Sequence, residues 1–144
     1  KYNNDRIKTQ ESRNQYDWST LGDFGLINQD GYLFITDRKA NMIISGGVNI
    51  YPQEAENRLL SHPEIKDVAV IGVPNSDFGE EVKGIVQLID SQKAGEVLAQ
   101  ELIEYCWETV SKIKSPRSID FVTELPRQEN GKLYKQLLKQ HYWA

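Results

Sequence analysis

The chain has 144 residues, of which 39% are hydrophobic and 26% charged, and its formal net charge is −4. These proportions exclude a disordered chain and fit one ordinary domain with an additional segment. No apolar run approaches the roughly 20 residues that cross a bilayer. The single cysteine, Cys106, cannot form an internal disulfide, so we expect a reducing, cytoplasmic compartment, with peripheral membrane contact left open.

Charge is distributed unevenly along the chain. Residues 1–110 carry a net charge of −8, and residues 111–144 carry one of +4. A basic end fits an anionic ligand, a nucleic acid or a membrane surface, and it also fits the solvated face of a helix. We do not expect a nucleic-acid partner, because the whole chain is acidic and contains no nucleic-acid-binding motif.

The first part of the chain predicts a β-hairpin. Residues 28–31, which read NQDG, are a turn signal between two apolar and aromatic runs at 24–27 and 32–35. Residues 1–16 show no pattern. Because the chain starts at Lys1 without a methionine or a secretory signal, we expect that it has been cut from a larger protein.

The second part predicts two short strands and a helix. Residues 42–51 form a strand pair broken by Ser45-Gly46-Gly47, where glycines permit positive φ or a close approach of another chain. Pro52 opens the helix, and His62-Pro63 ends it. Glu54 and Glu56 lie in its first turn, where the helix dipole favours anions.

The remaining residues predict two strands, a helix, a strand and a last helix. Strands are expected at 66–73, 80–90 and 118–125, and an amphipathic helix at 96–110. The apolar stripe of that helix consists of Leu98, Leu102, Cys106 and Val110. After Gly131 we expect a helix with three leucines inward and two lysines outward, namely Leu133, Leu137, Leu138, Lys135 and Lys139.

The order ββαββαβα over residues 42–144 predicts an α+β domain, with a small mixed sheet covered by helices. The hairpin within residues 1–36 precedes this core, and residues 37–41 form the boundary. The chain contains no phosphate loop, no dinucleotide-binding glycine motif, no nucleophile elbow and no metal-ligand cluster. What remains is a set of residues on turns that suit anions and hydroxyls: Asp23, Arg38, Gly46-Gly47 and Lys132.

Lys132 follows the turn-forming pair Asn130-Gly131. Such a lysine fits an ordinary polar loop before a helix, and it also fits a cation presented to a phosphate or carboxylate on a partner surface.

Three segments in this order resemble one known family: TLGDFGLINQDGYLFITDRKANMIISGGVNIYPQEAE, HPEIKDVAVIGVPNSDFGEEVKGIVQL and LPRQENGKLYKQLL. The chain from Trp18 onward is similar to the C-terminal part of AMP-forming acyl-CoA synthetases, and most similar to fatty-acid–CoA ligases. These belong to the adenylate-forming superfamily, with luciferases and the adenylation domains of peptide synthetases. The resemblance implies a parent enzyme that uses ATP and Mg²⁺, bound mainly by a missing N-terminal domain, and CoA as co-substrate.

The same resemblance implies a domain organisation. Residues 1–36 would be the end of the large N-terminal domain, residues 37–41 a hinge at Lys39 and Ala40, and residues 42–144 a small lid domain. The hinge departs from the family pattern, because Ala40 stands where Asp or Lys is common and Asn41 where Asp is common.

The resemblance also implies residue roles for adenylation. Lys132, in the segment PRQENGK, would reach the acid's carboxylate and the α-phosphate. Asp23 would bond the ribose hydroxyls of AMP, and Arg38 would contact the same ribose. The alternatives are a turn-capping role for Asp23 and a surface ion pair for Arg38.

For the thioester step, Ser45, Gly46 and Gly47 would line the tunnel of the pantetheine arm, and a tight hairpin turn is the alternative explanation of these residues. Lys114 and Arg117 are candidates for the CoA phosphates by charge and position alone. Gln136 stands where the family frequently has a basic residue, which predicts a weaker phosphate contact.

The implied function is activation of a carboxylic acid, with a fatty acid favoured, as acyl-AMP, followed by transfer to CoA. The 144 residues alone are expected to be inactive. One alternative is an adenylating enzyme that loads the phosphopantetheine of a carrier protein. Another is a stand-alone module that binds a partner without catalysis.

Overall fold

The computed structural model describes residues 10, 13, 15, 16, 23–27, 29, 31–38 and 41–143. The chain divides into two units, Lys1–Ala40 and Asn41–Ala144. This division falls inside the segment 37–41 predicted as the boundary, and the hinge function of that segment stays a prediction.

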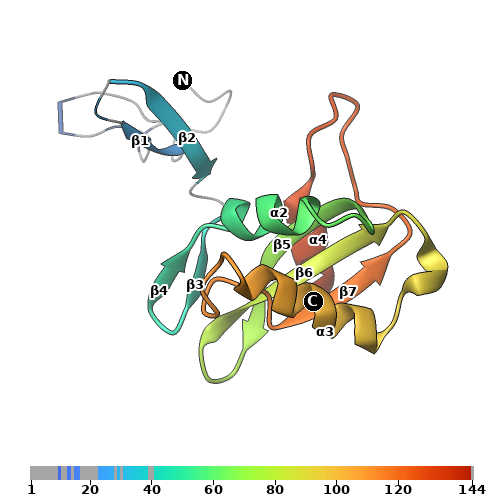
Figure 1. Ribbon diagram of the computed structural model, residues 1–144. Helices are drawn as coiled ribbons and strands as arrows, with labels where there is room; N and C mark the ends of the chain where they lie inside the picture. The colour runs from blue at the N-terminus through green and yellow to red at the C-terminus, as the bar shows by residue number, and fades with distance from the viewer. Residues whose placement is uncertain are drawn as a thin grey trace. The chain divides into compact units, whose positions relative to one another are not determined.

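The first unit contains the expected β-hairpin. Strands β1 (Asp23–Ile27) and β2 (Leu33–Arg38) are antiparallel, with Ile27 opposite Leu33 beside the turn and Asp23 opposite Arg38 at the far end (Figure 1). The turn contains Gly31, whose φ of 84° lies in the left-handed region that glycine adopts without steric cost.

The second unit has the predicted order ββαββαβα. Its elements are β3 (Ile43–Ser45), β4 (Val48–Ile50), α2 (Gln53–Leu60), β5 (Ile65–Asn75), β6 (Gly79–Leu88), a 3-10 turn at Ser91–Lys93, α3 (Glu96–Trp107), β7 (Ser118–Val122) and α4 (Lys135–Tyr142). Two elements are shorter than expected. Helix α3 ends at Trp107 and not at residue 110. The backbone turns there, because the amides of Thr109 and Val110 both donate to the carbonyl of Cys106. β7 ends at Val122, close to the end of its partner strand.

One five-stranded mixed sheet forms the centre of this unit. Strand β6 pairs antiparallel with β5 along its length, antiparallel with β3 at Gly79, and parallel with β7. The hairpin β3–β4 extends the sheet at one end, so the strand order is β4-β3-β6-β5 with β7 beside β6 (Figure 1). The mixed sheet predicted from the sequence is therefore confirmed.

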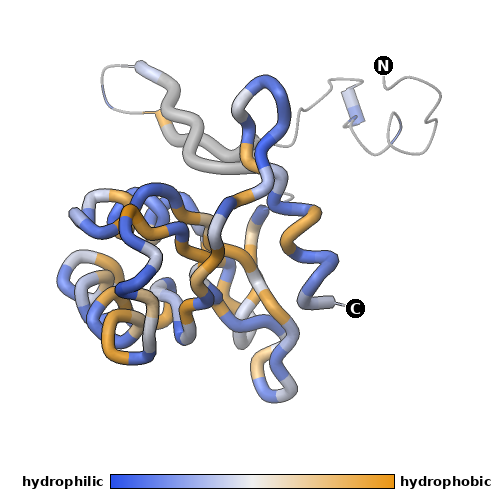
Figure 2. Tube along the Cα trace, turned by 90° about the vertical axis from the view of Figure 1, so that its right-hand side faces the viewer, coloured by the Kyte–Doolittle hydropathy of each residue, from blue (hydrophilic) through white to orange (hydrophobic). Residues whose placement is uncertain are grey.

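Helices cover both faces of the sheet. Alternate residues of β5 enter two apolar clusters: Val68 and Val70 pack with α2 and α3, while Ala69 and Ile71 pack toward α4. Figure 2 shows apolar residues along the central strands and polar residues in the outlying loops. Burial on both faces explains why β5 reads as a continuous apolar run instead of an alternating one.

The orientation predicted for α4 is partly wrong. Leu138 and Tyr142 pack against the second cluster, but Leu137 is half exposed and Lys135 points inward. Because the helix begins at Lys135, residues 135, 138 and 142 follow the i, i+3, i+7 spacing that places them on one face. In the part of the chain that the structure describes, no helix is long and apolar enough to cross a membrane.

Candidate functional site

Lys132 lies on a tight turn between β7 and α4. Gly131, with φ of 78°, donates its amide to the carbonyl of Gln128 at 2.8 Å. The Asn130 side chain accepts the amide of Lys132 at 3.0 Å. The left-handed glycine and the asparagine cap are the features that the Asn-Gly pair supplies to a turn. The Lys132 side chain is exposed and forms no ion pair or hydrogen bond with any residue that the structure describes.

The two legs of this turn form a short hairpin over residues 126–134. The amide of Gln128 donates to the carbonyl of Lys132 at 2.9 Å, and the amide of Tyr134 donates to Pro126 at 2.8 Å. Leu125 is 2% exposed and Leu133 packs against the same cluster. The hairpin is thus rooted in the second apolar cluster, while its tip projects into solvent.

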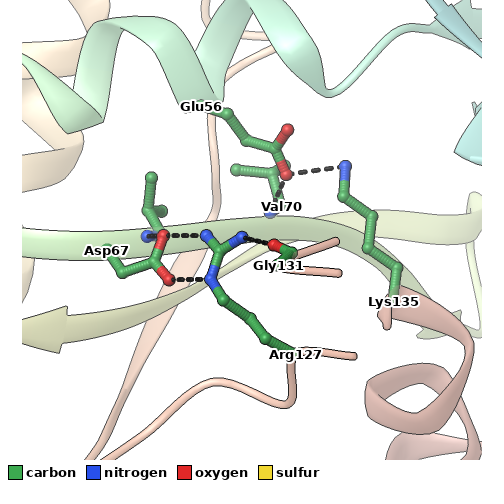
Figure 3. Close-up of polar contacts among 7 residues, drawn as sticks. Glu56, Asp67, Val70, Arg127, Gly131 and Lys135 are labelled. Atoms are coloured by element: carbon green, nitrogen blue, oxygen red, sulfur yellow. Dashed lines mark hydrogen bonds and ion pairs between the residues drawn. The ribbon is translucent and has the colours of Figure 1, made fainter. Parts of the chain in front are cut away.

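Arg127 connects this hairpin to the sheet. Its Nε and Nη2 donate to the two carboxylate oxygens of Asp67 on β5, at 2.8 and 2.7 Å. Its Nη1 donates to the carbonyl of Gly131 at 2.7 Å. Figure 3 shows the guanidinium between Asp67 and Gly131. One arginine therefore links β5 to the peptide unit that directly precedes Lys132.

A second ion pair holds the start of α4. Lys135 Nζ lies 2.7 Å from Glu56 Oε1 on α2, and the same oxygen accepts the Val70 amide of β5 at 2.7 Å (Figure 3). Both charged side chains are 10% exposed. This arrangement contradicts the predicted outward position of Lys135, because the buried carboxylate of Glu56 draws the ammonium inward.

A different turn carries the other candidate residues. Gly46 and Gly47 join β3 to β4 with φ of 55° and 80°, while Ser45 is buried and pairs with Val48. Two consecutive positive φ angles define the type I′ turn that suits a two-residue hairpin. Ser45 belongs to strand β3, so only the two glycines break the strand pair.

Phe78, which was not among the residues predicted from the sequence, completes this second turn region. The Gly46 amide donates to the Phe78 carbonyl at 2.9 Å. A Cβ on Gly46 would lie 3.2 Å from the Phe78 ring. Arg117 lies over the same ring, with its guanidinium carbon 4.3 Å from the ring centre. The glycine turn and the candidate Arg117 are therefore neighbours through Phe78.

The other candidates differ in how far the structure describes them. Lys114 forms an ion pair with Glu54 at 2.8 Å, so a phosphate would have to compete with that carboxylate. Asp23 and Arg38 are opposite each other in the β1–β2 register, which places both backbones at one end of the hairpin. Lys39 and Ala40 lie outside the described residues.

Residues 54–132 match the family model of the AMP-binding enzyme C-terminal domain. The chain belongs to this family. The match ends at Lys132, so the AMP-binding enzyme C-terminal domain includes the complete turn that presents this lysine. The family resemblance and the α+β fold expected from the sequence are thereby confirmed.

The relatives that this chain is similar to include CoA ligases and a chimera solved with ATP bound. The chain is 37% identical over 139 residues to the long-chain-fatty-acid–CoA ligase FadD13 of Mycobacterium tuberculosis. The matched residues make up 95% of this chain and 27% of that ligase. An ATP-bound RpMatB-BxBclM chimera is 36% identical with a TM-score of 0.86, covering 94% of this chain and 27% of the chimera. The o-succinylbenzoate CoA synthetase MenE of Bacillus subtilis, solved with its acyl-adenylate intermediate, is 34% identical with a TM-score of 0.80, covering 94% and 27%. The chain thus spans about a quarter of their length.

Three residues around the candidate site were missed or misinterpreted: Glu56, Asp67 and Arg127. Glu56 carried a readable signal, since it lies one position after Ala55 and three before Leu59 and so belongs to the apolar stripe of α2. A charged residue within such a stripe indicates a buried partner. Asp67 and Arg127 are 60 positions apart, and nothing local in the sequence pairs them.

Proposed function

We propose that this chain is the C-terminal part of an ATP-dependent, AMP-forming acid–CoA ligase. In the first half-reaction a carboxylate oxygen attacks the α-phosphorus of ATP, the bond to pyrophosphate breaks, and acyl-AMP forms. In the second, the thiol of CoA attacks the acyl carbonyl, loses its proton, and AMP leaves. The observation that carries this proposal is the exposed ammonium of Lys132, which has no partner among the described residues and stands on a tight turn inside the family match.

Lys132 is assigned to the first half-reaction. Two anions, the carboxylate and the α-phosphate, must approach each other, and negative charge accumulates between them. An ammonium that is already in position stabilises that charge without reorganisation. Lys132 suits this role better than the nearby Lys135, whose ammonium is occupied by Glu56.

Asp23 and Arg38 are assigned to the ribose of the nucleotide, and Lys39 and Ala40 to a hinge. A carboxylate accepts hydrogen bonds from two neighbouring hydroxyls, and an arginine supplies donors to the same sugar. The backbone register that brings residues 23 and 38 opposite each other supports a shared target. Within the described residues no group of three or more acidic, His or Cys side chains is placed to hold a metal ion. No magnesium ligand is assigned among these described residues.

The Gly46-Gly47 turn is assigned to the second half-reaction. Gly47, which has no neighbour within 4 Å of the position that a Cβ would take, leaves room for the narrow pantetheine arm, while Gly46 packs against Phe78. Arg117 lies beside it through Phe78 and is the candidate for a CoA phosphate, while Lys114 is the weaker candidate because Glu54 occupies it. The single cysteine, Cys106, is buried and free, which supports placing the enzyme in a reducing cytoplasm.

The substrate is proposed to be a carboxylic acid, with fatty acids as the first class to test. The long-chain-fatty-acid ligase matches 95% of the chain. The succinylbenzoate enzyme, which acts on an aromatic acid, is 34% identical and covers 94% of the chain, so the acid panel should include both classes.

The test uses Lys132→Ala in the full-length protein that carries this chain, with the two half-reactions measured separately. Acid-dependent release of pyrophosphate should fall about 100- to 1,000-fold. Thioester formation from supplied acyl-AMP and CoA should change little. Lys66→Ala removes another exposed lysine and serves as the control. Equal loss of both half-reactions would contradict the assignment.

Two further assays address the alternatives. The isolated 144 residues should release no AMP in an acid-dependent manner, because most ATP contacts are expected elsewhere. In the full-length protein, CoA should be a better acyl acceptor than a phosphopantetheinylated carrier protein. A preference for the carrier protein would replace the CoA ligase with a carrier-loading enzyme.

A further inference from the structure

The tip of the Lys132 hairpin has few fixed points of its own. Between Arg127 and Leu133, three bonds of its backbone among the described residues stay within the turn: Gln128 to Lys132, Gly131 to Gln128, and Lys132 to the Asn130 side chain. Gly131, directly before the lysine, has no neighbour within 4 Å of the position a Cβ would take. A glycine in open space can change its φ and ψ at little cost. The direction in which Lys132 leaves the turn therefore needs support from outside the turn.

Arg127 supplies that support. Two of its nitrogens are fixed by Asp67, which is held on the longest strand of the sheet and also accepts the Val68 amide at 2.9 Å. The third nitrogen donates to the Gly131 carbonyl at 2.7 Å. The planar guanidinium carries its donors in a rigid fork, so fixing two of them fixes the third. The peptide plane between Gly131 and Lys132 is thereby held relative to β5.

We propose that Arg127 is a positioning residue for Lys132, with Asp67 as its fixed support and the Gly131 carbonyl as the group that it holds. This inference rests on the proposed function of Lys132 in adenylation. Arg127 itself is not assigned to the substrate, because all the donors described above are occupied within the chain.

The exposure of the ion pair distinguishes this role from a purely structural one. The Arg127 side chain is 43% exposed and that of Asp67 18%. Ion pairs near the surface contribute little to folding stability. The Glu56–Lys135 pair, with both side chains 10% exposed, secures the start of α4 independently of Arg127. Loss of Arg127 should therefore leave the fold intact and release only the turn.

The consequence for catalysis can be large despite the small effect on stability. Displacement of a reacting group by about 1 Å can reduce a rate by about 100-fold. Arg127→Ala should therefore lower acid-dependent pyrophosphate release about 100-fold. Thioester formation from supplied acyl-AMP should stay within about twofold of the unmodified protein, because Lys132 is assigned only to adenylation.

Two variants test the geometry of the contact rather than its charge. Arg127→Lys keeps the positive charge but cannot hold both Asp67 oxygens and the Gly131 carbonyl, so adenylation should recover only in part. Exchanging the two residues, as Arg127→Asp with Asp67→Arg, restores an ion pair but leaves no donor at position 127 for Gly131. This double variant should keep the thermal stability of the unmodified protein without regaining adenylation.

A readout independent of activity comes from amide hydrogen exchange. In Arg127→Ala, the amides of Gln128 and Gly131, which bond within the turn, should exchange several-fold faster. The Tyr134 amide, at the base of the hairpin, should change less. Lys93→Ala is the matched control, because it breaks the exposed ion pair with Glu64 elsewhere on the unit. It should alter neither the exchange of these amides nor adenylation.

The outcomes separate this inference from the proposed function. If Lys132→Ala abolishes adenylation and Arg127→Ala leaves both adenylation and exchange unchanged, the positioning role is wrong while the function stands. If Arg127→Ala reduces both half-reactions equally, with a large loss of thermal stability, the residue is structural and the inference is overturned. If Lys132→Ala leaves adenylation normal, the proposed function itself fails. Selective loss of adenylation together with faster exchange at the turn supports both.

Discussion

Lys135 Nζ lies 2.7 Å from Glu56 Oε1, and this contact ties the last helix of the chain to the first helix of the same unit. The carboxylate also accepts the Val70 amide, so one oxygen connects α2, β5 and α4 (Figure 3). Lys135 is only three positions after Lys132. The pair therefore fixes the C-terminal leg of the hairpin that presents the candidate catalytic lysine.

The first prediction concerns the stability of this buried pair. Lys135→Met leaves the Glu56 carboxylate without its cation and should reduce the free energy of unfolding by about 3–5 kcal/mol. Chemical denaturation followed by circular dichroism would measure the change.

A second variant shows whether the cost comes from the uncompensated charge. The double variant Glu56→Gln with Lys135→Met keeps an acceptor for the Val70 amide and removes both charges. It should recover at least half of the stability lost in Lys135→Met. Lys93→Met, which breaks an exposed pair, is the control and should leave the unfolding midpoint unchanged. A double variant less stable than Lys135→Met would show that the stability lost in Lys135→Met does not come from the uncompensated charge of Glu56.

Local patterns in the sequence were sufficient for the elements and their order. The continuous apolar run of β5, the Gly46-Gly47 turn and the stripe of α3 each depend on residues close together in the chain. The α+β class and the small mixed sheet were also predicted, from the order of strands and helices over residues 42–144.

The side-chain partners could not be predicted in the same way. A lysine on a helix usually points to solvent. Lys135 points inward because it forms an ion pair with Glu56, which lies 79 positions earlier in the chain. Arg127 was counted only as one charge of a basic end, although it holds both Asp67 and Gly131. Long-range polar contacts depend on the tertiary fold, and they produce no periodic pattern in the amino-acid sequence from which they could be predicted.

The second prediction concerns the β3–β4 turn. Gly47→Ala places a Cβ at φ of 80° and should destabilise the unit by about 1–2 kcal/mol, whereas Gly47→Asn should cost less because asparagine tolerates this region. Gly46→Ala adds a Cβ only 3.2 Å from the Phe78 ring and should cost more than Gly47→Ala. Thermal unfolding would rank the three variants. A Gly46→Ala variant as stable as the unmodified chain would rule out the tight contact with Phe78.

The third prediction concerns the only cysteine of the chain. Cys106 is fully buried in the first apolar cluster, and burial raises the pKa of its thiol. Because the thiolate is the reactive form, an aromatic disulfide reagent at pH 8 should not modify the folded chain. One thiol per chain should react once guanidinium unfolds it. Rapid labelling under native conditions would mean that α3 opens locally, and hydrogen exchange of its amides would then locate the opening.

A second polar junction secures the far end of α4. Asp120 on β7 accepts hydrogen bonds from Lys83 Nζ at 2.8 Å and from the Tyr142 hydroxyl at 2.6 Å. Burial alone would raise the pKa of Asp120, but these two hydrogen bonds outweigh burial and hold that pKa below its usual range. Burial and the bond to Asp120 raise the pKa of Tyr142, so the hydroxyl remains a donor across the ordinary pH range.

The last prediction follows from the lowered pKa of Asp120. A carboxyl group with a lower pKa in the folded than in the unfolded state stabilises the fold above its unfolded pKa, about 3.9. That contribution is lost as pH falls from about 4 through the folded value, because the protonated group no longer accepts from Lys83 as an anion. Asp120→Asn should lower the unfolding midpoint at pH 7 and flatten its decline below pH 4. Tyr142→Phe removes only one of the two donors and should give a smaller change at both pH values. Urea unfolding of the three proteins between pH 7 and pH 3 would measure these differences. An Asp120→Asn profile parallel to that of the unmodified chain would show that other carboxylates cause the acid sensitivity.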